Sequence, residues 1–217
     1  MITTLDGRRI ESETDSTTTL HGAIDEARRD CPPENLIVTV RLNGRELVDA
    51  ELEAMLDRAL HTEDQVDLVS TNRRELAALA LRDAAEAIER SGSDAERIAD
   101  GLQGGVTEGG ASEVVALFKA WTAANETVSQ CCQLLDEDLT ERRHNERSVR
   151  EYLAELADRL RELRDALEAG DMVLLGDIVR YELPELSRQW GELLRALAEE
   201  IAPLETNRAT PAEPPAI

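Results

Sequence analysis

The sequence predicts an α+β protein that is mostly helical, with a small N-terminal α/β domain followed by an antiparallel bundle of long helices. Three observations carry this prediction. The first 72 residues combine β-branched runs with tight-turn dipeptides, whereas residues 73–202 repeat apolar residues at helical spacing. Residues 203–217 hold four of the seven prolines and few apolar residues, which is typical of a disordered tail. We therefore divide the chain into 1–72, 73–202 and 203–217.

Two strands at the N-terminus, Ile2–Leu5 and Arg8–Glu11, flank Asp6-Gly7, a dipeptide suited to a hairpin turn. A polar run then supplies a cap for a helix that begins at Leu20, where apolar residues recur at helical spacing. This helix must end near Cys31, because two prolines follow and the residue before a proline is pushed out of the α region.

The second half of this domain predicts a hairpin, a helix and a last strand. Leu36–Leu42 is rich in β-branched residues and meets the return strand Arg45–Val48 at Asn43-Gly44, a strong hairpin signal. A helix follows over Ala50–Leu60, capped by the aspartate before it. Gln65–Ser70 is the final strand. These elements form one small mixed sheet with two helices, but the sequence does not fix its strand order.

Helices are predicted throughout residues 73–202. Their ranges are Arg73–Arg90, 95–103, Ser112–Leu139, Asn145–Glu168 and a last segment capped by Asp171 and reaching Ile201. Glycines between 101 and 110 predict a flexible connection. The stripe of the third helix is Val114, Phe118, Trp121, Val128, Cys132, Leu135 and Leu139. Pro184 predicts a kink, or a break with the proline in the first turn of a new helix.

The composition excludes several classes of protein. There are 46 acidic and 24 basic residues, and a net charge of −22 repels nucleic acid and anionic membranes. The longest apolar run, Leu76–Leu81, is far shorter than the ~20 residues of a membrane span. The N-terminus lacks the apolar core of a signal peptide, and three cysteines make no disulfide framework. We expect a cytoplasmic protein. Its excess of Arg over Lys is typical of a GC-rich genome, such as a bacterial one. Adaptation to high salt is a second interpretation of this composition, because an acidic surface helps to keep a protein soluble at high salt.

The densest set of metal-compatible side chains is Asp136, Asp138, Glu141 and His144. Glu141 and His144 have the i, i+3 spacing used in di-iron bundles, but that chemistry needs a second Glu-x-x-His, which is absent. A solvated, charged helix end is the preferred interpretation. The alternative function is an acidic, metal-binding or ligand-responsive regulator that uses these four residues.

No catalytic constellation is found. The sequence has no Gly-x-Ser-x-Gly, its Gly-rich stretch lacks the Gly-Lys-Ser/Thr of a phosphate loop, and three scattered histidines leave little material for acid–base chemistry. Adjacent Cys131 and Cys132 have no basic neighbour to activate them, so they are interpreted as structural. We predict neither an enzyme nor a cofactor.

The segment 170–184, leading to Trp190, is the most unusual in the chain. It places Gly176 inside a helix, and its apolar residues point at nearly every angle. One interpretation is a central core helix. The functional interpretation is an apolar groove that accepts a partner helix. The candidate partner-binding residues are Leu175, Gly176, Val179, Tyr181 and Trp190.

These features together predict a non-catalytic cytoplasmic protein that interacts with another protein, such as an adaptor, an assembly factor or a chaperone. Acidic helical secretion chaperones of the flagellar export type share this general character, which is an analogy of class and not of motif. The expected partner is a protein bound by a helix-in-groove contact, with no role for nucleic acid or membrane. The long apolar stripes could also close a homodimer.

Overall fold

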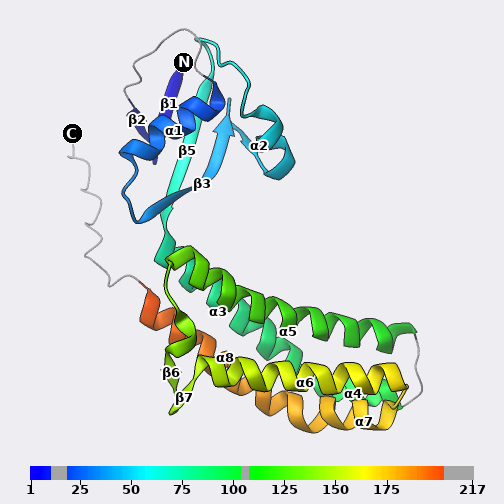
Figure 1. Cartoon of the computed structure of the whole chain (residues 1–217). Coiled ribbons are helices and arrows are strands. Elements are labelled where there is room, and N and C mark those ends of the chain that lie inside the picture. The colour runs from blue at the N-terminus through cyan, green and yellow to red at the C-terminus, as the bar shows by residue number, and fades with distance from the viewer. Residues whose placement is uncertain (11–18, 104–107, 203–217) are drawn as a thin grey trace, which may run out of the picture. The chain divides into compact units, whose positions relative to one another are not determined.

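The computed structural model describes residues 1–10, 19–103 and 108–202 (Figure 1). It confirms the predicted fold class, because an N-terminal mixed sheet is followed by long packed helices. The chain forms two compact units, Met1–Leu76 and Ala77–Ile217, so the boundary falls a few residues after the predicted one. The predicted tail, residues 203–217, lies outside the described residues.

Within the described residues, the sheet of the first unit has five strands in the order β2-β1-β5-β3-β4. The strands are β1 (Ile2–Leu5), β2 (Arg8–Ile10), β3 (Asn35–Leu42), β4 (Arg45–Leu47) and β5 (Gln65–Asn72). The central pair β1 and β5 is parallel and every other pair is antiparallel. Both predicted hairpins form, and Asp6, Gly7, Asn43 and Gly44 all have φ between 52° and 79°. Two consecutive left-handed residues are what a tight two-residue turn requires.

Helix α1 (Leu20–Asp30) lies against one face of this sheet (Figure 1). The Thr19 hydroxyl caps it by accepting a hydrogen bond from the Gly22 N–H (3.2 Å). The buried residues that α1 shares with the sheet are Leu20, Ala23, Ile24 and Ala27 from the helix and Leu5, Ile10, Val40, Leu42, Leu47, Val66 and Leu68 from the strands. Aliphatic side chains therefore fill this core without a single aromatic residue.

Helix α2 (Asp49–Met55) is shorter than the predicted Ala50–Leu60. The predicted cap is wrong, because Asp49 has φ 41° and Val48 stands at the N-cap without a side-chain hydrogen bond. The helix ends early because the carbonyls that follow it accept hydrogen bonds from the first residues of α1. Leu20 and His21 donate their N–H groups to the carbonyls of Arg58 and Leu56.

In the described part of the second unit, four long antiparallel helices pack with two short ones (Figure 1). The long helices are α3 (Arg73–Ser93), α5 (Glu108–Leu135), α6 (Val149–Ala169) and α8 (Leu183–Ile201), and the short ones are α4 (Ala95–Gln103) and α7 (Met172–Asp177). The predicted glycine linker is partly wrong, since Gly101 lies in α4 and Gly109 and Gly110 lie in α5. None of the helices in the described ranges is long and apolar enough to cross a membrane.

Two tryptophans meet at the centre of this bundle. Trp121 of α5 and Trp190 of α8 are both fully buried, and their rings pack edge to face with centroids 6.1 Å apart and planes at 80°. Edge-to-face packing of aromatic rings adds to the free energy gained by burial alone. This pair therefore ties α5 to α8.

The predicted apolar stripe of α5 is confirmed at Val114, Trp121, Val128 and Leu135, but not at Phe118 and Cys132. Its buried residues are Val114, Leu117, Trp121, Ala124, Val128, Cys131 and Leu135, which is an unbroken 3-4 repeat. Phe118 and Cys132 lie only half-buried at its margin. The helix ends at Leu135 rather than Leu139, because Asp136 turns into the left-handed region with φ 54°.

Helix α6 begins at Val149 and not at the predicted Asn145. Residues 143–148 instead form a small hairpin, β6 (Arg143–His144) and β7 (Arg147–Ser148). Ser148 then caps α6 in a capping box, because its hydroxyl accepts from the Glu151 N–H (3.3 Å) while the Glu151 carboxylate accepts from the Ser148 N–H (2.6 Å). This cap fixes the start of the helix.

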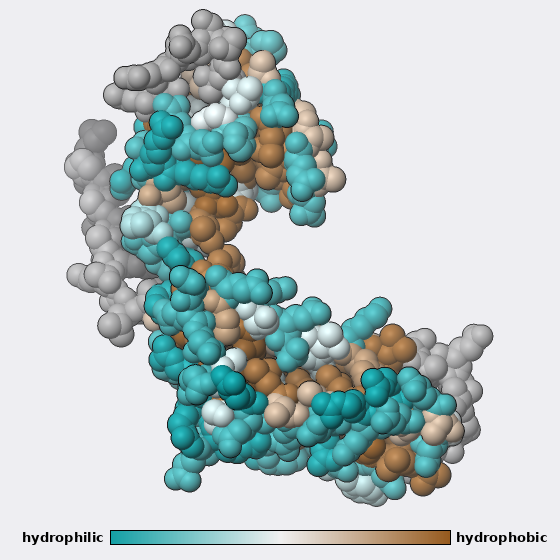
Figure 2. Space-filling model, in the orientation of Figure 1, coloured by the Kyte–Doolittle hydropathy of each residue, from teal (hydrophilic) through white to brown (hydrophobic). Residues whose placement is uncertain are grey.

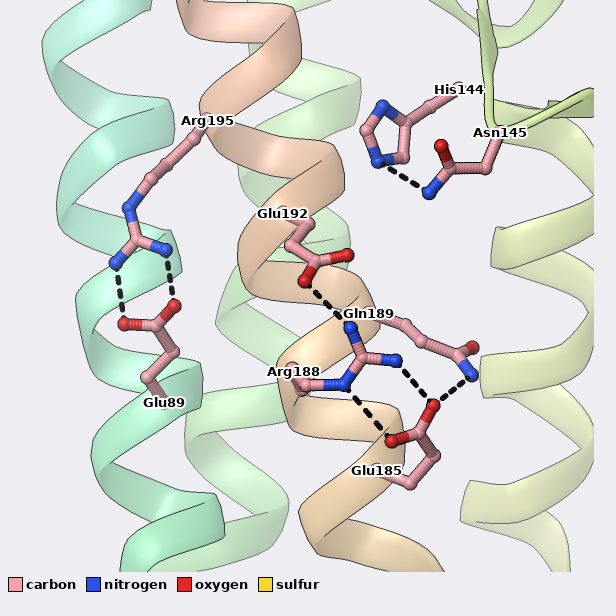
Figure 3. Close-up of polar contacts among 8 residues, drawn as sticks. All are labelled: Glu89, His144, Asn145, Glu185, Arg188, Gln189, Glu192 and Arg195. Atoms are coloured by element: carbon pink, nitrogen blue, oxygen red, sulfur yellow. Dashed lines mark hydrogen bonds and ion pairs between the residues drawn. The ribbon is translucent and has the colours of Figure 1, made fainter.

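Helices α3 and α8 approach closely at two glycines. A Cβ built on Gly92 would lie 2.5 Å from the Ser187 Cβ, and one on Gly191 would lie 2.9 Å from the Glu89 Cγ. The Glu89 carboxylate accepts two hydrogen bonds from the Arg195 guanidinium across the same contact (Figure 3). These bonds hold the pKa of Glu89 below its usual range. Glycine is needed here for space, not for an unusual φ.

Candidate functional site

The segment that joins α7 to α8 changes its helical pitch. Asp171 caps α7 as predicted, since its carboxylate accepts from the Leu174 N–H (3.0 Å). The next residues, Ile178–Glu182, form a π turn in which the Leu183 N–H donates to the Ile178 carbonyl. Pro184 follows in the first turn of α8, so the predicted break takes the form of a wide turn. Proline is tolerated in the first turn of a helix, where an N–H has no partner within the helix, and π turns often mark functional sites.

The structure corrects the predicted groove. Four of its five residues, Leu175, Gly176, Val179 and Trp190, are buried in the bundle core, so they do not line an open surface. The reason is that α4, α6 and α8 enclose the inward side of α7 and of the π turn. Tyr181 alone is exposed, at 71%.

The opposite side of the same segment is also apolar, which was not predicted from the sequence. Val173 is 73% exposed and Leu174 is 47% exposed in α7, and the exposed Tyr181 follows in the π turn of the same segment. We call Val173, Leu174 and Tyr181 the α7 outer face. Figure 2 shows hydrophobic residues gathered at the end of the bundle that α4 and α7 form. The sequence signal for this exposed side is that apolar residues occur at every helical angle, whereas a core helix needs them on its inward side only.

Acidic side chains surround the α7 outer face. Glu168, Asp171 and Asp177 are exposed around it. Arg164 lies 3.9 Å from Glu168, whereas Arg180 is only 24% exposed and is paired with Asp100 of α4. The surface therefore offers an apolar centre with a negative rim, which favours an apolar partner that carries positive charge.

Three of the four predicted metal-site residues make other polar contacts. The Asp138 carboxylate accepts from the Thr140 hydroxyl (2.7 Å) and N–H (2.9 Å), and these bonds lower the pKa of Asp138. Glu141 pairs with Arg150, and His144 contacts Asn145 (Figure 3). Asp136 is the exposed residue that ends α5. Within residues 1–10, 19–103 and 108–202 no three His, Cys, Asp or Glu side chains are placed to hold a metal ion.

Several charged side chains of α8 pair with one another along the helix. Arg188 donates to Glu185 (2.6 and 3.0 Å) and to Glu192 (2.6 Å), and Gln189 also donates to Glu185 (2.8 Å) (Figure 3). These hydrogen bonds lower the pKa of Glu185 to about 2, so the carboxylate stays ionised at neutral pH. Carboxylates held by such pairs make a solvated helix surface and not an acid–base pair.

Of the two adjacent thiols, Cys131 is the buried one and Cys132 is half-buried. Burial raises the pKa of the Cys131 thiol to about 11. A raised pKa keeps the thiol protonated at neutral pH, and the thiolate is the reactive form. Cys131 is therefore a poor nucleophile, which agrees with its structural interpretation.

We expect Cys131 to resist alkylation in the folded protein. In a variant with Cys31→Ser and Cys132→Ser, iodoacetamide at pH 8 should modify Cys131 at least ten times more slowly in buffer than in denaturant, as followed by mass spectrometry. The matched variant that keeps only Cys132 should show a smaller protection. Equal rates for Cys131 in both conditions would contradict its burial.

Comparison with known proteins adds the family. A family described as Domain of unknown function (DUF8042) matches residues 80–193. The chain belongs to this family. The DUF8042 match begins within α3 and ends within α8, so it contains the tryptophan pair, both close-approach glycines and the α7 outer face. No solved structure matches the chain.

A bacterial relative extends beyond the DUF8042 match. An uncharacterized protein of Treponema pallidum (strain Nichols) is 28% identical over 176 residues, which cover 79% of this chain and 83% of the relative. The helical unit Ala77–Ile217 is shorter than this alignment. The similarity therefore reaches into the sheet unit as well.

Proposed function

We propose that this DUF8042 protein is a non-catalytic, cytoplasmic interaction protein, such as an adaptor, an assembly factor or a secretion-type chaperone. Its partner places an amphipathic helix on the α7 outer face. The observation that carries the proposal is the exposure of Val173 (73%) and Tyr181 (71%) on a segment whose other side is fully buried. Large apolar side chains gathered on one exposed surface mark interaction sites.

The acidic rim defines the chemistry of the partner. Asp171 and Asp177 flank the apolar centre, so the docking helix carries Lys or Arg beside its apolar stripe. Binding of this kind combines burial of apolar area with attraction that salt screens. A basic amphipathic helix is thus the expected ligand class.

The first test uses two model peptides, an amphipathic helix of Leu and Lys and its Leu and Glu counterpart. Fluorescence anisotropy should show binding of the Lys peptide only. Val173→Ser combined with Tyr181→Ser leaves the net charge unchanged and should weaken this binding at least fivefold, because the apolar centre is lost. Leu79→Ser is the matched control, since Leu79 is an apolar residue of α3 that is 52% exposed.

The second test identifies the natural partner. Affinity capture from the native host with the wild-type chain should recover a stoichiometric protein that the Val173→Ser, Tyr181→Ser variant loses and the Leu79→Ser control keeps. Equal recovery by all three proteins, or recovery of no stoichiometric partner, would overturn the proposal.

A further inference from the structure

Helix α5 is much less charged than its neighbours. It has four charged residues among 28, which are Glu108, Glu113, Lys119 and Glu126. Helix α6 has ten among 21. In a chain with a net charge of −22, a long helix with so little charge is unusual, because charge elsewhere keeps the surface solvated.

The side of α5 that faces away from the core is exposed and nearly uncharged. A shallow hollow runs along it, lined by Val115, Phe118, Lys119, Thr122, Ala123 and Glu126, which we call the α5 outer face. Val115 is 47% exposed, and Thr122 and Ala123 are small. In Figure 2, pale and brown residues interrupt the hydrophilic surface along the α5 side of the bundle.

The two charges on this face are arranged symmetrically. Lys119 and Glu126 are seven residues apart, about 10 Å along the helix, with Thr122 and Ala123 between them. That spacing is too long for an ion pair within one helix. Neither residue has an ion-pair partner in the part of the chain that the structure describes, and Lys119 is the only lysine in the sequence.

The geometry points to a second copy of this chain as the occupant of the α5 outer face. In a two-fold contact, residue i meets residue j while j meets i. Two antiparallel α5 helices that cross between Thr122 and Ala123 bring Lys119 of each copy to Glu126 of the other. The small residues at the crossing allow close approach, and the two reciprocal ion pairs set the register.

Charge favours a second copy over another kind of partner. Two chains of this acidity repel one another, so they can meet only where the surface carries little net charge. The middle of the α5 outer face carries one positive and one negative side chain, which complement each other only under two-fold symmetry. A basic partner would find no excess of carboxylates there, unlike at the α7 outer face.

Sedimentation of the full chain tests the proposal by charge reversal. We expect a dimer that dissociates on dilution, with a dissociation constant at least ten times higher for Lys119→Glu and for Glu126→Lys. Combining the two changes should restore the wild-type value, because each ion pair re-forms with its charges exchanged. Arg161→Glu, on the exposed side of α6, is the control for added negative charge and should leave the dimer intact.

A zero-length carbodiimide cross-linker identifies the contact directly. It joins an amine to a carboxylate only where they touch, and Lys119 supplies the only lysine amine. We expect a covalent dimer whose linked peptides contain Lys119 and Glu126. A monomer at 100 µM, failure of the double variant to restore dimerisation, or linkage of Lys119 to a carboxylate of the sheet unit would overturn the proposal. None of these variants alters the α7 outer face, so loss of dimerisation and loss of partner binding are separate results.

Discussion

Replacing Trp190 by Ala should lower the free energy of unfolding of the helical unit by about 3–5 kcal/mol. The side chain is fully buried, and it contacts Trp121 edge to face. Truncation removes its apolar area from the core and leaves a cavity that the packed helices fill only in part. The loss should be measured by denaturant unfolding, followed through the fluorescence of Trp121, the only tryptophan that remains.

Two further variants make this result specific. Tyr181→Ala changes an aromatic residue that is 71% exposed and should shift the free energy by no more than about 0.5 kcal/mol. Trp190→Phe should cost less than Trp190→Ala, because it keeps a ring and removes an indole N–H that has no hydrogen-bond partner among the described residues. A Trp190→Ala protein as stable as wild type would show that the tryptophan pair is not part of the core.

Local signals in the sequence predicted the elements that depend on neighbours in the chain. Asp6-Gly7 and Asn43-Gly44 gave both hairpins of the sheet, because these residues adopt positive φ at low cost. The polar run before Leu20 and the cap at Asp171 likewise marked starts of helices that the structure confirms. Turns and helix caps depend on residues that are neighbours in the chain, so a single sequence is enough to predict them.

The hairpin before α6 was not predicted, because its turn residues give only a weak local signal. Its turn residues, Asn145 and Glu146, both have positive φ, and Glu is not a typical turn residue. The signal that could have placed it is Ser148 with Glu151, a capping box that starts α6 and leaves the preceding residues outside the helix. The hydrophobic pattern alone extended the helix too far.

The candidate surfaces depend on tertiary packing, which one sequence does not contain. Between 172 and 181 apolar residues occupy every helical angle, so the pattern marked the segment but not its exposed side. Contact with α4 decided that Leu175 and Val179 are buried while Val173 and Tyr181 remain exposed. Likewise, the packing of α5 placed Leu117 and Cys131 in the core instead of the predicted Phe118 and Cys132.

Replacing Gly92 by Ala should destabilise the helical unit by about 1–3 kcal/mol, although alanine is the better helix former. The new methyl group would lie 2.5 Å from the Ser187 Cβ and 3.7 Å from the Pro184 Cα. Neither atom belongs to a flexible side-chain end, so α3 and α8 must move apart. Gly101→Ala is the matched control, because nothing lies within 4 Å of its Cβ position and it should stabilise α4 by up to about 1 kcal/mol.

A double-mutant cycle attributes the Gly92 effect to the α3–α8 contact. Ser187→Gly removes the opposing Cβ, so Gly92→Ala should cost less in that background than in wild type, with the difference appearing as a coupling free energy in denaturant unfolding. In the double variant, α3 carries the side chain at the crossing and α8 carries the glycine. Stabilisation by Gly92→Ala, similar to that by Gly101→Ala, would mean that α3 and α8 do not approach as closely as the structure places them.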